Sequence, residues 1–140
     1  MHIKKMPYVC GIMIIGLSLA SCMTVPKESE IPAEATAADL TQKAQEAFDA
    51  NNYRGAYAYY RIILKRFASD ESVCVAAEYE IAHLHIKTQR WREAVVILEK
   101  IISRYEEDAA GIHLPPDYYK LAKIDHARAT EKLGRKAQKQ

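Results

Sequence analysis

The feature that most constrains this chain is an internal repeat with a period of 38 residues. Displacing the sequence by that distance aligns eight pairs of similar residues: Ala44 with Ala82, Tyr53 with Trp91, Arg54 with Arg92, Ala56 with Ala94, Tyr60 with Leu98, Ile63 with Ile101, Leu64 with Ile102, and Phe67 with Tyr105. A fixed period of about 20–50 residues is typical of solenoids, in which one unit cannot bury its apolar face alone. The repeat therefore predicts a short solenoid of similar units.

Within each unit the apolar residues follow the spacing of an amphipathic helix. In the second unit the steps are three, four, three, one and three along Trp91, Ala94, Leu98, Ile101, Ile102 and Tyr105. The first unit repeats this pattern from Ala56 to Phe67. Another helical stretch precedes each of these, near residues 37–50 and 73–88, with Asn51-Asn52 and Gln89-Arg90 at the junctions. We expect two helical hairpins in an all-α fold.

The aligned positions resemble the tetratricopeptide repeat (TPR). Repeat position 8 is a small residue in both units (Ala44 and Ala82), and position 17 is aromatic (Tyr53 and Trp91). Position 20 is alanine (Ala56 and Ala94), and position 24 is a bulky apolar residue (Tyr60 and Leu98). The period is longer than is usual in that family, Ala68 stands where proline is common, and neither hairpin turn contains glycine. These departures imply a longer loop between repeats.

A third unit is expected after the loop of residues 106–116, whose glycine and paired prolines end one helix and precede another. Residues 117–133 are predicted to be helical, with Ala127 at the eighth repeat position and a turn around Gly134. Lys136 then occupies the aromatic position, so we expect a truncated hairpin. The predicted domain covers residues 37–138, as repeats 37–68 and 73–106 and a partial repeat 117–138, about two and a half in all.

The N-terminus has the layout of a secretory signal, with two lysines in residues 1–7 and an uncharged run over residues 8–20. The sequence Leu19-Ala20-Ser21-Cys22 resembles the lipobox of bacterial lipoproteins. That resemblance implies a signal peptide of residues 1–21, fatty acylation of Cys22, and a lipid-anchored, solvated tether over residues 22–36. Met23, in place of an aspartate retention signal, favours the outer membrane, facing the periplasm. The alternative is an ordinary or uncleaved signal in which Cys22 is incidental.

Neither charge nor motifs indicate nucleic-acid binding or catalysis. Without Lys4 and Lys5 the chain carries 18 basic and 18 acidic side chains, which lacks the basic excess of a nucleic-acid binder. His83 and His85 would point about 200° apart on a helix and cannot share one ion. The sequence contains no HExxH, P-loop, GxGxxG or nucleophile elbow. We expect no enzyme activity, no cofactor and no metal, and we expect Cys74 to act as a small hydrophobe.

The TPR resemblance implies a concave surface lined by the first helix of each hairpin. On the first hairpin it would contain Thr41, Gln45, Phe48 and Asp49, and on the second Tyr79, His83, Ile86 and Lys87. We predict that Phe48, Tyr79, His83, Ile86 and Lys87 form a partner-binding groove. The alternative for Tyr79 is packing against the tether or the first repeat.

The predicted function is a membrane-anchored periplasmic scaffold that binds other envelope proteins and catalyses no reaction. The BamD-like scaffolds of outer-membrane protein assembly are similar in layout, although they contain about five repeats. The alternatives are an accessory or regulatory subunit of an envelope enzyme, or a carrier of a small ligand. The sequence leaves the partner and the oligomeric state open.

Overall fold

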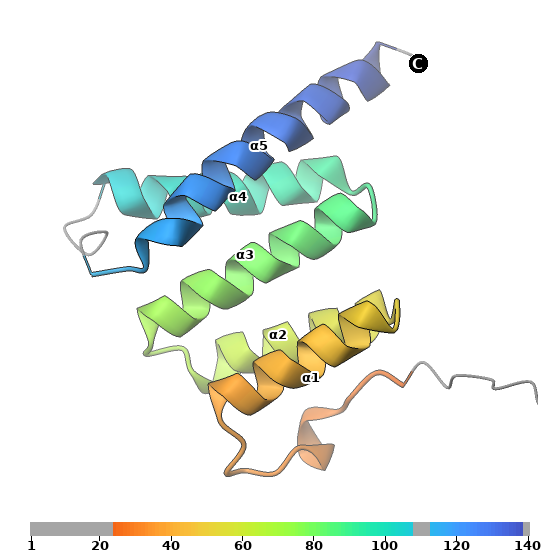
Figure 1. The fold of residues 1–140 in the computed structure, drawn as a ribbon, viewed down its shortest axis with the longest axis vertical. Coiled ribbons are helices and arrows are strands. Elements are labelled where there is room, and N and C mark those ends of the chain that lie inside the picture. The colour runs from red at the N-terminus through yellow and green to blue at the C-terminus, as the bar shows by residue number, and fades with distance from the viewer. Residues whose placement is uncertain (1–23, 108–112, 139–140) are drawn as a thin grey trace, which may run out of the picture.

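The computed structural model describes residues 24–107 and 113–138. These residues form a short 3-10 helix, η1 (Glu28–Glu30), and five α-helices: α1 (Ala37–Asp49), α2 (Tyr53–Arg66), α3 (Glu71–Lys87), α4 (Trp91–Glu107) and α5 (Pro116–Ala137). No strand occurs in these two ranges, and the predicted all-α class is confirmed for them. Helices α1 and α2 pair, α3 and α4 pair, and α5 packs against α4 and α3 (Figure 1). None of these helices is both long and apolar enough to cross a bilayer.

Side-chain caps mark where α1, α2 and α3 begin. The hydroxyl of Thr36 accepts a hydrogen bond from the Asp39 N–H at 3.1 Å, where the sequence places the start of the fold. Asn52 Oδ1 accepts from the Gly55 N–H at 3.0 Å, and Asp70 caps α3 in the same way. Each cap satisfies an amide that has no partner inside its helix. Pro116 occupies the first turn of α5, where its missing N–H costs nothing.

The turns of the two hairpins share the same backbone geometry. The turn residues Asn51 and Gln89 both have positive φ, 58° and 59°. The N–H of each donates to the carbonyl three positions earlier, on Phe48 at 2.8 Å and on Ile86 at 3.0 Å. The next residue in each turn donates to the carbonyl five positions earlier, at 2.8 Å in both hairpins. All eight pairs that are aligned by the 38-residue period also match in burial. The sequence period is therefore a structural repeat.

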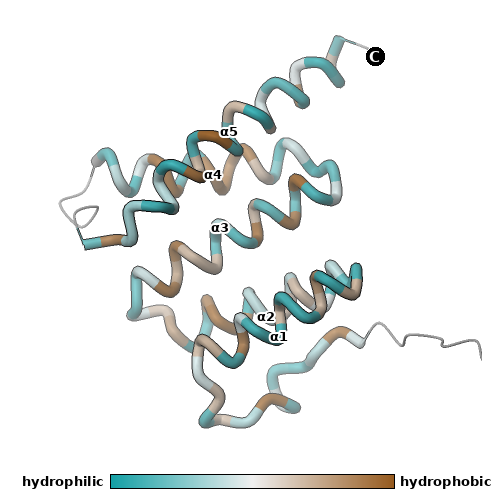
Figure 2. Tube along the Cα trace, in the orientation of Figure 1, coloured by the Kyte–Doolittle hydropathy of each residue, from teal (hydrophilic) through white to brown (hydrophobic). Residues whose placement is uncertain are grey.

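Helix α3 lies between two clusters of buried side chains. The first cluster joins α1 and α2 to Ala77, Ile81 and Leu84 of α3. The second joins α4, α5 and Leu114 to Val75, Tyr79 and Ala82 of α3. Because α3 is covered on both sides, its buried residues are distributed around the helix instead of along one stripe. Figure 2 shows hydrophobic positions along α3 and a largely hydrophilic C-terminal part of α5.

The sequence prediction for the third unit is wrong in two respects. Helix α5 continues through Gly134 to Ala137, so no turn occurs between residues 131 and 135. Ala127, which was assigned to a buried repeat position, is exposed. The buried residues of α5 are Ala122, Asp125 and Ala129, which form one stripe against α4 and α3. Gly134 does not adopt a positive φ and therefore does not end the helix.

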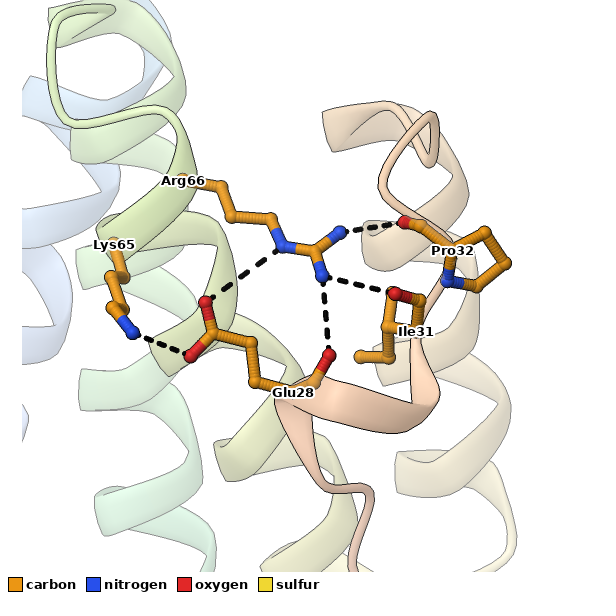
Figure 3. Close-up of polar contacts among 5 residues, drawn as sticks. All are labelled: Glu28, Ile31, Pro32, Lys65 and Arg66. Atoms are coloured by element: carbon orange, nitrogen blue, oxygen red, sulfur yellow. Dashed lines mark hydrogen bonds and ion pairs between the residues drawn. The ribbon is translucent and has the colours of Figure 1, made fainter.

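The predicted signal peptide and Cys22 lie outside the described residues, but much of the predicted tether is described, and it is not a free linker. Arg66 Nη1 donates to the Pro32 carbonyl at 2.8 Å, and Nη2 donates to the carbonyls of Ile31 at 3.1 Å and Glu28 at 3.3 Å (Figure 3). Lys65 adds an ion pair with Glu28 at 2.7 Å. The side chain of Ile31 packs on the first cluster. Residues 28–32 are therefore held at the C-terminal end of α2.

Candidate protein-binding face

Three of the five predicted groove residues meet between α1 and α3. The Phe48 ring on α1 lies 6.0 Å from the His83 ring on α3, and Lys87 Nζ lies 5.7 Å from the Phe48 centroid. Tyr53 packs edge-on against the other side of Phe48, at 5.5 Å between centroids. Phe48 and His83 are half-buried and Lys87 is exposed. An apolar ring flanked by a cation and an imidazole is suited to an amphipathic protein segment.

Tyr79 does not line an open groove, and this part of the prediction is wrong. Its side chain is 8% exposed because α5 covers it. The hydroxyl donates to Asp125 Oδ2 at 2.8 Å, and the ring lies 5.6 Å from the Tyr118 ring. Burial, followed by the hydrogen bond to the Asp125 carboxylate, raises the pKa of Tyr79 well above its usual value. The alternative of packing against the tether or first repeat is also not observed, since Tyr79 belongs to the second cluster.

The sequence did not predict the polar cluster that α5 adds to this face. Asp125 is 5% exposed and accepts the Tyr79 hydroxyl, while Arg128 Nη1 lies 3.3 Å from its second oxygen. His83 Nδ1 lies 3.7 Å from Asp125 Oδ2 and makes no hydrogen bond within the described residues. These contacts connect α3 to α5 directly behind the half-buried His83 ring. The helical spacing of Ala122, Asp125 and Ala129 could have indicated this cluster in the sequence. A carboxylate within an apolar stripe is, however, usually predicted to be exposed to solvent.

Ile86 contributes to a different part of the surface. Its side chain packs against the second cluster and borders a groove of about 680 Å³ between the end of α3 and the end of α5. The remaining groove residues are mostly cationic: Lys87, Gln89, Trp91, Lys132, Arg135 and Lys136. Lys87 therefore takes part in both the Phe48 contact and this basic groove.

His85 and Cys74 lie apart from His83 in the described part of the chain. His85 points to the other side of α3 from His83, where its ring lies 6.0 Å from Tyr57 and only 7% of it is exposed. Burial, with the nearby Arg90, lowers the pKa of His85. Burial also raises the pKa of the Cys74 thiol, whose sulfur lies 3.4 Å from the Phe67 carbonyl. Residues 24–107 and 113–138 contain no group of three metal-ligating side chains.

The open part of the face is therefore smaller than the sequence predicted. Phe48, His83 and Lys87 remain accessible, and Gln45 and Asp49 are exposed on the neighbouring turns of α1. Thr41 is half-buried, and its hydroxyl donates to the Ala37 carbonyl of the same helix. We call the surface formed by Gln45, Phe48, Asp49, His83 and Lys87 the inner face. It presents one half-buried aromatic ring and one half-buried imidazole among exposed polar and charged side chains.

An uncharacterized protein of Treponema pallidum (strain Nichols) is 41% identical to the chain over 115 residues. The match covers 82% of this chain and 46% of the relative, so the chain spans about half the length of the protein it matches. No family model matches the chain, and neither does any solved structure.

Proposed function

We propose that this chain is a lipid-anchored TPR-like scaffold of the bacterial envelope, and that it binds another protein on its inner face. The anchor is Cys22, and the anchored domain faces the periplasm, at the outer membrane. The chain acts by holding a partner and performs no reaction of its own.

The observation that carries the proposal is the contact of Phe48 with His83 and Lys87 across two successive hairpins. Equivalent turns bring α1 and α3 into corresponding positions, so the first helices of the two hairpins share one surface. On that surface a half-buried aromatic ring lies beside exposed polar side chains, a combination that is common where proteins bind one another. The lipobox-like sequence before Cys22 supports the location.

Site-specific photocrosslinking in native membranes tests the proposal. A photoreactive residue at Gln45 or Lys87 samples the inner face, whereas one at Val96, 61% exposed on α4, samples another surface. We expect the same envelope protein to be crosslinked from both inner positions and not from Val96. The charge reversal Lys87→Glu should weaken the crosslink formed from Gln45.

His83→Ala combined with Lys87→Ala supplies a second variant without disturbing the fold, because neither side chain is fully buried. A Tyr79 variant is unsuitable, because it would remove a buried hydrogen bond and confuse loss of binding with unfolding. Loss of the crosslink with unchanged thermal stability supports the inner face. Equal crosslinking from Gln45 and Val96 would show that the inner face is not the binding surface.

A further inference from the structure

One end of the molecule carries a concentration of positive charge that the overall charge balance conceals. Figure 1 shows the α1–α2 turn, the α3–α4 turn and the C-terminal end of α5 on the same side. Three adjoining hollows lie at this end, and their basic lining residues include Arg54, Lys87, Arg90, Arg92, Lys132 and Lys136. We call these six residues the basic end. Among the described residues, Glu93 is the one acidic side chain in the linings of these hollows, and it lines one of them.

Most of this charge is not neutralised by neighbouring carboxylates. Among residues 24–107 and 113–138, only Arg90 of the six forms an ion pair, with Glu93 at 2.9 Å. The nearby Arg135 is also paired, with Glu131. The five remaining side chains, including Lys132 and Lys136 one turn apart on α5, are exposed. Unpaired cations on one surface attract an anionic partner.

Apolar and aromatic side chains accompany the cations. Trp91 is half-buried at the start of α4 and borders two of the hollows. Tyr57 is 38% exposed and Val25 is 41% exposed, and both line the third hollow beside Arg54 and Arg90. Tryptophan and tyrosine favour the interface between headgroups and hydrocarbon, where one part of the ring is apolar and another is hydrated. The combination suits a lipid surface better than a purely ionic ligand.

The N-terminal segment reaches the molecule at this same end. Asn52, in the α1–α2 turn, donates through Nδ2 to the Thr24 carbonyl at 2.8 Å. Val25 lines the same hollow as Tyr57, and Arg66 donates to the carbonyls of Glu28, Ile31 and Pro32 further along. Thr24 is two residues from Cys22, a chain length of about 7 Å when extended. An acyl chain on Cys22 would therefore hold the basic end close to the membrane.

We propose that the basic end docks on anionic phospholipid headgroups of the membrane that carries the Cys22 anchor. This inference rests on the proposed lipid anchor, because the anchor's position selects a membrane over a soluble polyanion as the occupant. Phosphate groups would bind Arg54, Arg92, Lys132 and Lys136, and Trp91 would enter the headgroup layer. The solenoid would then stand with its turns on the membrane, with the opposite ends of its helices directed away.

Trp91 allows a direct test because it is the only tryptophan in the chain. The acylated protein is reconstituted in vesicles of phosphatidylcholine, alone or mixed with phosphatidylglycerol, whose acyl chains are brominated near the headgroup. In the mixed vesicles we expect Trp91 emission to shift to shorter wavelength and to be largely quenched, with reversal in high salt. In pure phosphatidylcholine vesicles the anchored protein should retain most of its emission.

Paired charge removals on α5 provide the matched variants. Lys132→Gln with Lys136→Gln should restore the Trp91 emission, whereas Lys120→Gln with Lys123→Gln, near the other end of the same helix, should not. The mature-length chain with Cys22→Ser, added to preformed vesicles, isolates the basic end from the anchor. Its affinity for mixed vesicles should fall about tenfold in the Lys132/Lys136 variant.

The outcomes separate this inference from the proposed function. Acylated protein that floats with vesicles while Trp91 stays unquenched in the mixture overturns the docking and leaves the anchor intact. Protein that does not float overturns the anchor, and the Cys22→Ser chain then decides the docking alone. Equal effects of the two lysine pairs, or binding of a single-stranded oligonucleotide without binding of vesicles, would also overturn the membrane assignment.

Discussion

Asn51 and Gln89, 38 residues apart, adopt the same left-handed backbone conformation, with φ values of 58° and 59°. That conformation is disfavoured for residues with a side chain, and asparagine tolerates it better than glutamine. Glycine is the common solution at the end of a helix. Both hairpins therefore contain an unfavourable backbone conformation at the same position. Its energetic cost is lower for Asn51 than for Gln89.

We expect Gln89→Gly to raise the free energy of unfolding by up to about 1 kcal/mol, because glycine adopts positive φ without steric cost. Asn51→Gly should be neutral or destabilising, since it also removes the hydrogen bond from the Tyr53 hydroxyl to Asn51 Oδ1 at 2.9 Å. Urea unfolding of the two variants makes the comparison. A loss of stability in Gln89→Gly would contradict the assignment of strain to this turn.

The hairpins could be predicted because the residues that specify them are close together in the sequence and occur in two similar copies. Helical spacing and the Asn51 and Gln89 junctions place α1 and α3 within two residues of the predicted ranges. Helix α5 lacks this support, because the segment before it differs in length and its apolar stripe contains Asp125. The register that places Ala127 at the eighth repeat position depends on a turn at Gly134, and the helix continues through that residue.

The polar contacts between distant segments had no sequence signal. Arg66 binds backbone carbonyls, and because every residue offers one, the sequence does not indicate which of them are bound. Tyr79 reaches Asp125 across 46 positions, and neither residue belongs to a recognisable pattern. Both contacts depend on tertiary packing. The sequence therefore predicts Tyr79 in an open groove and a solvated tether, whereas the structure has a covered tyrosine and a segment that Arg66 binds.

Loss of the Tyr79 hydroxyl should destabilise the packing of α5. Tyr79→Phe leaves the buried Asp125 carboxylate without its 2.8 Å donor, which should cost about 1–3 kcal/mol. Tyr118→Phe is the matched control, because the Tyr118 ring packs on Tyr79 but its hydroxyl does not bind Asp125. Chemical denaturation of both variants decides the matter. Similar losses in the two would mean that the hydrogen bond contributes little.

Overpacking at Ala94 should disrupt the second hairpin. Ala94 is 0% exposed and belongs to the cluster shared by α3, α4 and α5, so Ala94→Leu should cost about 1–3 kcal/mol. Val96→Leu, two residues along the same helix and 61% exposed, should leave thermal stability unchanged. The melting temperatures of the two variants provide the measurement. An unaffected Ala94→Leu variant would be incompatible with the observed packing of α4.

Release of Arg66 should free the N-terminal segment without unfolding the domain. Arg66→Gln removes the donors to Glu28, Ile31 and Pro32, so trypsin should cleave after Lys27 several-fold faster than in the unmodified protein. Lys65→Gln is the control, since its exposed ion pair with Glu28 contributes little. Mass spectrometry of a short digest measures the cleavage. Equal rates in the two variants would indicate that Arg66 does not hold the segment.

The anchor is testable by changing one atom of the chain. Cys22→Ser removes the thiol that would carry diacylglycerol, so fatty-acid labelling should disappear and an unprocessed or mislocalised precursor should remain. Each buried methylene contributes about 0.8 kcal/mol, so the variant without acyl chains should bind the membrane much more weakly than the acylated protein.

Cys74→Ser provides the matched control, because Cys74 lies half-buried within α3 and its thiol contacts the Phe67 carbonyl. That variant should keep full labelling and normal processing. Metabolic labelling with a radioactive fatty acid, followed by membrane fractionation, compares the two serine variants with the unmodified chain. Persistent labelling of Cys22→Ser would exclude Cys22 as the attachment site. The contacts that Asn52 and Arg66 make with residues 24–32 would then not serve to position a lipid anchor at Cys22.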